Sequence, residues 1–234
     1  TRGLLSPFSA IMVRSEAGFH RLIRLGLDRK SVELTSALLA GGQALPCHEP
    51  DLADLSCALV GRPIWFANQV LEGELSTVLA AHRQSLRMSD QDFRVHKWGE
   101  SGYPDASTQI MIAGDPAEVG LFYRLAPVSF LGSSLVSEGS GCDPFEAAAL
   151  GSAVLYGPKI RRFLPSYTRL VAEGAARIVN DATTLGTAVS RLIAPDQAAT
   201  MAHAGWDVIS RGAALTDKVI DLVQDTLDTR ERRG

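Results

Sequence analysis

Extended basic segments are missing from this sequence. Its formal net charge is −3, and the most compact group of positive charges, Arg230, Arg232 and Arg233, lies near the carboxyl end. Proteins that bind nucleic acid through its phosphate backbone carry a basic patch or stripe instead. The sequence therefore predicts no nucleic-acid partner.

Cysteine and histidine are sparse. Cys47, Cys57 and Cys142 form no Cys-x-x-Cys pair and no even set, which argues against a disulfide framework and indicates a reducing compartment. The histidines do not show the spacing of metal ligands. We therefore expect neither a metal ion nor another cofactor.

A membrane span and a signal peptide are also absent. No apolar run reaches the ~20 residues that a membrane-spanning helix needs, and the sequence begins at Thr1 without an initiating Met. With 46% hydrophobic and 21% charged residues, the composition is typical of a soluble globular protein. We interpret the chain as a soluble fragment of a longer protein.

Strand and helix patterns alternate along the chain. Short apolar runs predict strands at 9–13, 31–34, 63–67, 94–96, 108–113, 128–131 and 177–179, with one more before Gly157. Helical spacing predicts helices at 15–25, 51–59, 72–86, 116–124 and 166–174, one after Asp143, and three final helices beginning near Asp181, Ala194-Pro195 and Thr216. Strands separated by helices of about 10–15 residues imply an α/β fold with a parallel, doubly wound sheet.

The segment 130–158 is the most informative part of the sequence. It predicts a buried strand, a loop rich in glycine and serine, a helix and a second strand. Asp143 fits the N-cap of the helix, Pro144 its first position and Glu146 its third, as in a capping box. Both carboxylates could simply complete the helix. Alternatively, residues 139–141 let the backbone approach a nucleotide phosphate, and Glu146 binds ribose hydroxyls.

Other polar residues have plainer interpretations. Cys142 has no evident partner base, so we interpret it as a packing residue and not as a nucleophile. Glu72 and Glu74 form an acidic first helical turn. The basic residues at 159–162 could face an anionic ligand, but a solvated basic surface is the favoured interpretation.

Several segments occur in an order that carries more information than any one of them. They are 61–65 (GRPIW), 72–74 (EGE), 80–82 (AAH), 114–119 (GDPAEV) with Tyr123, 130–135 (FLGSSL), 140–148 (SGCDPFEAA) and 153–158 (AVLYGP). This series resembles the carboxyl-terminal half of the Kdo transferases. These enzymes move 3-deoxy-D-manno-octulosonic acid (Kdo) from CMP-Kdo onto lipid A.

The resemblance implies a fold and a division of the chain. The family has the GT-B fold, in which two Rossmann-like domains face each other and the carboxyl-terminal one holds the sugar nucleotide. Residues 1–45 would be the end of the acceptor domain and the interdomain linker, and residues 46–234 the donor-binding domain. The full-length protein would act at the cytoplasmic face of the bacterial inner membrane, attached through the missing amino-terminal acceptor half.

The resemblance also implies site residues and a reaction. Those expected to bind CMP are Pro116, Ala117, Glu118, Asp143, Pro144, Phe145 and Glu146. Those expected to form a phosphate loop are Gly132, Ser133, Ser134 and Gly141. Kdo would be transferred to a lipid A precursor by inverting, direct displacement, with the catalytic base outside this chain. The fragment alone would then be inactive.

Some positions depart from the family pattern. Cys142 and Asp143 replace a His and an Asn of the family. The interval 83–93 is too short for the family strand that ends in Pro-Arg-His-Pro-Glu-Arg. Either that segment has been lost, or a stretch of chain is left out. We favour omission, because loss of a central strand should leave a costly cavity.

Two alternatives to the first interpretation stay open. One is an enzyme with the same fold that uses another sugar nucleotide, such as a UDP-sugar transferase or epimerase. The other is a non-enzymatic module whose altered motifs no longer bind a nucleotide.

Overall fold

The computed structural model describes residues 5, 7–8, 10–35, 44–88, 92–100, 102–136 and 138–232. The chain divides into two compact units, one of residues 42–208 and one of residues 1–41 with 209–234. Each unit is described by itself. None of the described helices is both long and apolar enough to cross a membrane.

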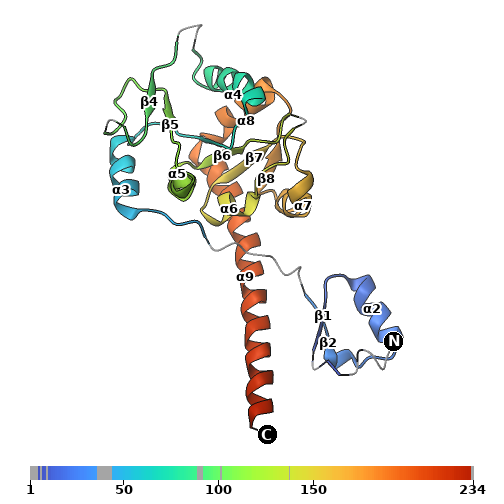
Figure 1. The fold of residues 1–234 in the computed structure, drawn as a ribbon. Coiled ribbons are helices and arrows are strands. Elements are labelled where there is room, and N and C mark those ends of the chain that lie inside the picture. Colours follow the sequence, from blue (N-terminus) through green and yellow to red (C-terminus); the bar gives the residue numbers. More distant parts are fainter. Residues whose placement is uncertain are drawn as a thin grey trace. The chain divides into compact units, whose positions relative to one another are not determined.

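The unit of residues 42–208 is built on a four-stranded parallel sheet (Figure 1). The strands are β3 (Phe66–Asn68), β6 (Val128–Leu131), β7 (Ala153–Tyr156) and β8 (Ala176–Ile178), in the order β3-β6-β7-β8. One row of the register joins Ala67, Phe130, Leu155 and Arg177. Since β6 and β7 are buried along their whole length, both faces of the sheet must be covered, as in a doubly wound fold.

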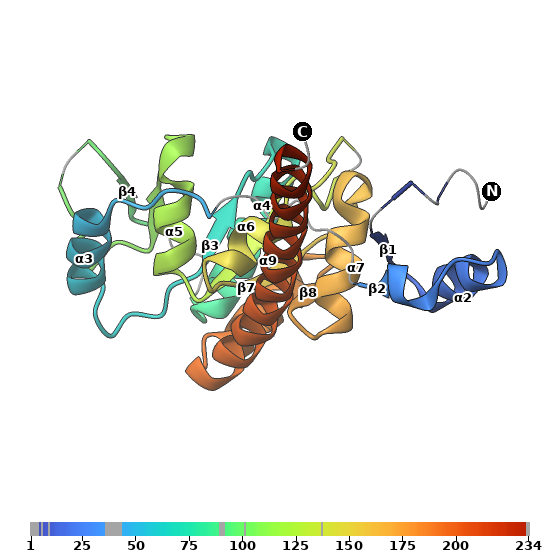
Figure 2. The ribbon, with the colours of Figure 1, turned by 90° about the horizontal axis from the view of Figure 1, so that it is seen from below.

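Helices cover both faces of this sheet. On one face, α4 (Glu72–Ser85), α8 (Ala182–Leu192) and the start of α9 (Pro195–Glu231) bury a core that includes Phe130, Leu155 and Leu185. On the other face lie α5 (Val119–Leu125), α6 (Pro144–Ala149) and α7 (Leu164–Ala172), as the view in Figure 2 shows. The predicted parallel, doubly wound α/β sheet is confirmed.

A second, two-stranded parallel sheet consists of β4 (Val95–Lys97) and β5 (Ile110–Ile112). It packs with α3 (Glu49–Ala58) and α5 around a smaller core that includes Leu55, Leu121 and Phe122. In the described part of the chain no strand pairing joins this sheet to the four-stranded one. Between α4 and β4, the described residues 83–88 and 92–94 form no strand, so the family strand expected in this interval is not found there.

The ring of His82 forms hydrogen bonds with the segments that precede β3 and β5, one strand of each sheet. The Trp65 indole N–H donates to His82 Nδ1 at 3.0 Å, and His82 Nε2 lies 2.9 Å from the carbonyl oxygen of Gln109, just before β5. Because Nδ1 accepts, Nε2 must carry the proton and donate to that carbonyl. Burial lowers the pKa of His82, which keeps the ring in this neutral form.

The unit of residues 1–41 and 209–234 contains a parallel pair, β1 (Ile11–Val13) and β2 (Val32–Leu34), with α2 (Glu16–Arg24) and the 3₁₀ turn η1 (Arg29–Ser31) between them. Ser15 caps α2 by accepting from Gly18 N at 3.2 Å. Lys218 of α9 donates to Glu33 of β2 at 2.5 Å. The first residue of the strand predicted at 9–13 lies outside the described residues.

The prediction of a new helix near Thr216 is wrong, because α9 is continuous from Pro195 to Glu231. The Thr216 hydroxyl donates to the carbonyl of Gly212 at 3.2 Å. This bond to the preceding turn lets a threonine remain inside a helix instead of capping one. Further along, the apolar residues Ile220, Val223 and Leu227 are exposed.

Candidate functional site

Two groups of predicted ligand-binding residues follow parallel strands. Pro116, Ala117 and Glu118 form the 3₁₀ turn η2 (Pro116–Glu118) after β5. The loop 132–143 follows β6 and leads into α6. The carboxyl ends of parallel strands are where α/β proteins bind their ligands, so both groups occupy suitable positions.

The two groups share the sequence Asp-Pro-x-Glu, at 115–118 and at 143–146. Asp115 accepts from the amide of Ala117 at 2.8 Å, and Asp143 accepts from the amide of Phe145 at 3.0 Å. Each aspartate is thus the N-cap of the turn or helix that follows it. The N-cap predicted at Asp143 is confirmed. The predicted capping box is incomplete, because Glu146 makes no return bond to the Asp143 amide in this described segment.

The surroundings of the two turns differ. Asp115, Pro116 and Ala117 are exposed, whereas Pro144 and Phe145 are buried.

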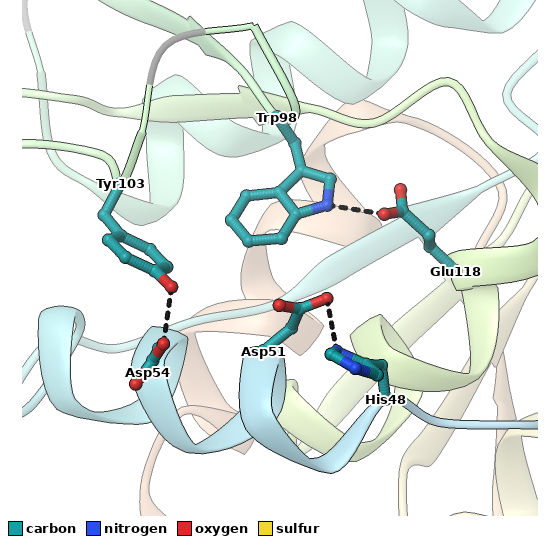
Figure 3. A network of polar contacts seen from close by, with 6 residues as sticks. All are labelled: His48, Asp51, Asp54, Trp98, Tyr103 and Glu118. Carbon is teal, nitrogen blue, oxygen red and sulfur yellow. Dashed lines mark hydrogen bonds and ion pairs between the residues drawn. The ribbon is translucent and has the colours of Figure 1, made fainter.

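Their glutamates also differ. Trp98 Nε1 donates to Glu118 Oε1 at 2.9 Å (Figure 3). Glu146 is half-buried, and among the described residues no hydrogen bond to its carboxylate is found. Burial, and secondarily the charge of Asp143, raises the pKa of Glu146. Glu146 therefore keeps both carboxylate oxygens free to accept hydrogen bonds, whereas Glu118 already uses one of its two oxygens.

A pocket of about 420 Å³ lies at the carboxyl ends of β4 and β5. Its lining residues are Lys97, Trp98, Gly99, Glu100, Ile112, Gly114, Asp115 and Glu118. An aromatic ring, carboxylates and an ammonium group suit a small polar ring that can stack and form hydrogen bonds. Residues 143–146 do not line this pocket, so it contacts only one of the two predicted groups.

Side chains next to the pocket tie α3 to its surroundings (Figure 3). The Tyr103 hydroxyl donates to Asp54 at 2.6 Å, and that hydrogen bond raises the pKa of Tyr103. His48, the N-cap residue of α3, places its Nδ1 2.8 Å from Asp51 in the first turn of that helix. In the described part of the chain, no group of three or more His, Cys, Asp or Glu side chains could hold a metal ion.

The loop after β6 corrects one expectation. The amides of Ser133 and Ser134 donate to the carboxylate of Glu74 at 2.7 and 2.8 Å. The amide of Gly132 donates to Asn68 O at 2.8 Å, and that of Gly141 donates to Ser133 O at 2.7 Å. All four amides of the expected phosphate loop are thus already paired, and they are not free to bind a phosphate.

The sequence interpretation missed the role of Glu74, whose carboxylate holds the loop after β6. It is fully buried, and it also accepts from the amides of Leu135 at 2.7 Å and Leu71 at 3.0 Å. Successive amides that converge on one point make an anion-binding nest, and here the anion belongs to the protein. The sequence did contain one signal for this role. Glu74 is the third residue of α4, a position where a glutamate often accepts from the N-cap amide.

The rest of the loop closes on Ser133. This residue has a left-handed backbone with φ of +53°, which is costly for serine and often found at functional sites. A Cβ at Gly139 would lie 2.2 Å from the Ser133 carbonyl oxygen, so only glycine fits there.

Cys142 is buried, and burial raises the pKa of its thiol to about 12. A thiol of such high pKa is a poor nucleophile, which agrees with the interpretation of Cys142 as a packing residue.

Comparison with curated proteins confirms the predicted relationship to the Kdo transferases. The 3-deoxy-D-manno-octulosonic acid transferase of Haemophilus influenzae is 23% identical over 192 residues, which cover 71% of this chain and 45% of that protein. The enzyme of the same name from Bordetella pertussis is 29% identical over 128 residues, covering 54% and 30%. The Rickettsia felis enzyme is 23% identical over 216 residues, covering 82% and 46%. The chain thus spans about half the length of these relatives, or less. No protein-family model matches it.

The chain also resembles solved structures in its fold. The C-terminal CMP-Kdo binding domain of WaaA from Acinetobacter baumannii has a TM-score of 0.60 at 20% identity, covering 68% of this chain and 96% of that one. Anabaena Alr3699/HepE in complex with UDP-glucose has a TM-score of 0.51 at 12% identity, covering 93% and 64%. The chain therefore has the α/β fold of GT-B glycosyltransferases, as predicted.

Proposed function

We propose that residues 46–234 are the donor-binding domain of a Kdo transferase and that residues 1–45 are the end of its acceptor domain with the linker. The joint likeness to Kdo transferase sequences and to the fold of a CMP-Kdo binding domain carries this proposal. The compact unit of residues 42–208 supports the first boundary, although residues 209–234 group with 1–41.

The donor CMP-Kdo would lie at the carboxyl ends of the strands. One set of contacts would come from Pro116, Ala117 and Glu118, beside the pocket of Trp98. The other set would come from 143–146, where half-buried Glu146 has free oxygens to accept from both ribose hydroxyls. A phosphate next to Asp143 would be repelled, so the ribose is the better partner for this end of the loop.

The complete protein would transfer Kdo to a lipid A precursor at the cytoplasmic face of the bacterial inner membrane, associated with the membrane through its other half. The transfer would be a direct displacement with inversion. It needs a base to remove the acceptor hydroxyl proton as that oxygen attacks, and the base would belong to the acceptor domain. This chain by itself would bind donor and transfer nothing.

Calorimetric titration with CMP, UMP and UDP tests the proposal. Preference for CMP supports it, preference for a uridine nucleotide supports an enzyme that uses a UDP-sugar, and binding of none supports a non-enzymatic module. Glu146→Gln should weaken CMP binding, whereas Asp143→Asn, which removes a charge that repels the phosphate, should strengthen it. Glu72→Gln, which removes an exposed carboxylate from the first turn of α4, is the matched control. If neither site variant changes the affinity, both residues are caps only.

A further inference from the structure

The loops at the carboxyl edge of the four-stranded sheet contain few positive charges. These loops are 69–71 after β3, 132–143 after β6, 157–163 after β7 and 179–181 after β8. By sequence, the Lys and Arg residues among them are Lys159, Arg161 and Arg162. The segment 159–162, called the basic segment below, therefore supplies the positive charge of the four loops.

The backbone of the basic segment is fixed against the loop that precedes α6. The Lys159 amide donates to Ser134 O at 2.7 Å, and the Gly157 amide donates to Ser134 Oγ at 2.8 Å. A Cβ at Gly141 would lie 3.2 Å from Ile160 Cα. The segment thus lies directly beside the Ser/Gly loop and the start of α6.

The side chains of the basic segment are available. Lys159, Arg161 and Arg162 are exposed, and within the described residues no carboxylate forms an ion pair with them. The Arg162 guanidinium lies 5.2 Å from the ring centroid of Phe163, a contact that leaves its N–H groups free at the edges. Five planar donors on each arginine suit a phosphate well.

The negative charges around this loop make cations necessary for binding a phosphate. Glu74 already occupies the amides of Ser133, Ser134 and Leu135, so the backbone nest cannot receive a second anion. Glu138 and Asp143 in the same loop, with Glu146 behind them, would repel a phosphate. A nucleotide can bind here only if cations offset this negative charge.

We propose that Lys159, Arg161 and Arg162 bind the phosphate of the nucleotide, in place of the backbone amides that Glu74 has filled. This inference rests on the proposed function, because it assigns the phosphate end of the same donor. It predicts that phosphate binding depends on side-chain charge and is therefore weakened by salt.

The ratio of the affinities for CMP and cytidine isolates the phosphate. For the wild-type chain we expect CMP to bind more tightly than cytidine, with a ratio that falls as salt rises. The variant Lys159→Ala/Arg161→Ala/Arg162→Ala should lower that ratio by about tenfold or more, since charge-assisted bonds are lost, and leave cytidine binding unchanged. The control is Arg191→Ala, an exposed cation in the last turn of α8, which should leave the ratio unchanged.

Inorganic phosphate separates the failure of this inference from the failure of the proposed function. Amide shifts of 159–162 should move on titration with phosphate in the wild type and stay fixed in the triple variant. If phosphate moves them but CMP does not bind, the basic segment stands and the CMP assignment falls. If CMP binds and the triple variant keeps the CMP-to-cytidine ratio, the inference is overturned.

Discussion

The two Asp-Pro-x-Glu turns, at 115–118 and 143–146, have the same sequence pattern and the same N-cap bond, yet they offer a ligand different groups. The first turn is exposed, and its Glu118 accepts from Trp98. The second is packed into the core by Pro144 and Phe145, and its Glu146 keeps free oxygens. Packing around a turn, more than its own sequence, decides how many oxygens of its carboxylate stay free for a ligand.

The segment before each turn extends the contrast. The first follows β5 through the exposed Gly114. The second follows a loop that is held by the buried carboxylate of Glu74 through the amides of Ser133, Ser134 and Leu135. The position of the second turn therefore depends on the buried carboxylate of Glu74. The first turn makes no use of this carboxylate.

Replacing that anion should have the largest effect. Glu74→Ala would leave buried amides without an acceptor and should lower the free energy of unfolding by on the order of 3 kcal/mol. Urea denaturation measures the loss. Formate, which can enter the vacated space and accept from the same amides, should restore part of the stability.

The matched control for this experiment is Glu72→Ala, two residues earlier and exposed. It should change the stability little, and formate should not affect it. Equal stability of the two variants would show that the loop after β6 does not rely on Glu74, and the contrast between the two turns would lose its basis.

Removing the caps tests the turns themselves. Asp143→Ala should cost about 1 kcal/mol, which is typical of an N-cap bond. Asp115→Ala should cost about half as much, because water can reach the exposed Ala117 amide that it leaves. Urea midpoints of both variants measure the difference. A larger loss at Asp115 would reverse the order that packing predicts.

The alternation of strands and helices could be predicted because each element carries its own local signal. The apolar strands β6 and β7, the Asp143-Pro144 start of α6 and the parallel direction of the strands all follow from residue patterns. The break predicted at Thr216 failed for a physical reason. A threonine can cap a helix or bond back within it, and the sequence alone does not show which.

The site was less predictable because it depends on contacts between distant segments. The glycines and serines of loop 132–141 indicated free amides, but Glu74 lies about sixty positions earlier and reaches them only in the fold. Likewise, nothing near Glu118 in the sequence shows that Trp98 donates to it. Local motifs identified the ends of the strands, whereas tertiary packing fixed which groups there are free.

The smallest expected effect compares the two glutamates directly. Burial raises the pKa of Glu146 in the folded protein, so folding favours its protonated form. Its contribution to stability is then fully present below the unfolded pKa of about 4.3 and is lost as the pH rises through the folded pKa. Glu146→Gln should therefore have a slightly higher urea midpoint than the wild type at pH 7 and the same midpoint at pH 4. Glu118→Gln should instead lower the midpoint slightly, because the Trp98 indole loses a charged acceptor.

At the second turn, the substitution that raises stability should lower the affinity for CMP. The wild type should lose CMP affinity as acid protonates Glu146, since a neutral carboxyl accepts less well from ribose hydroxyls. Glu146→Gln should bind weakly at every pH, so it gains stability and loses function, a trade typical of binding residues. If both glutamine variants lower the urea midpoint at pH 7 to the same extent, Glu146 is a structural partner like Glu118, and packing has not set the two carboxylates apart.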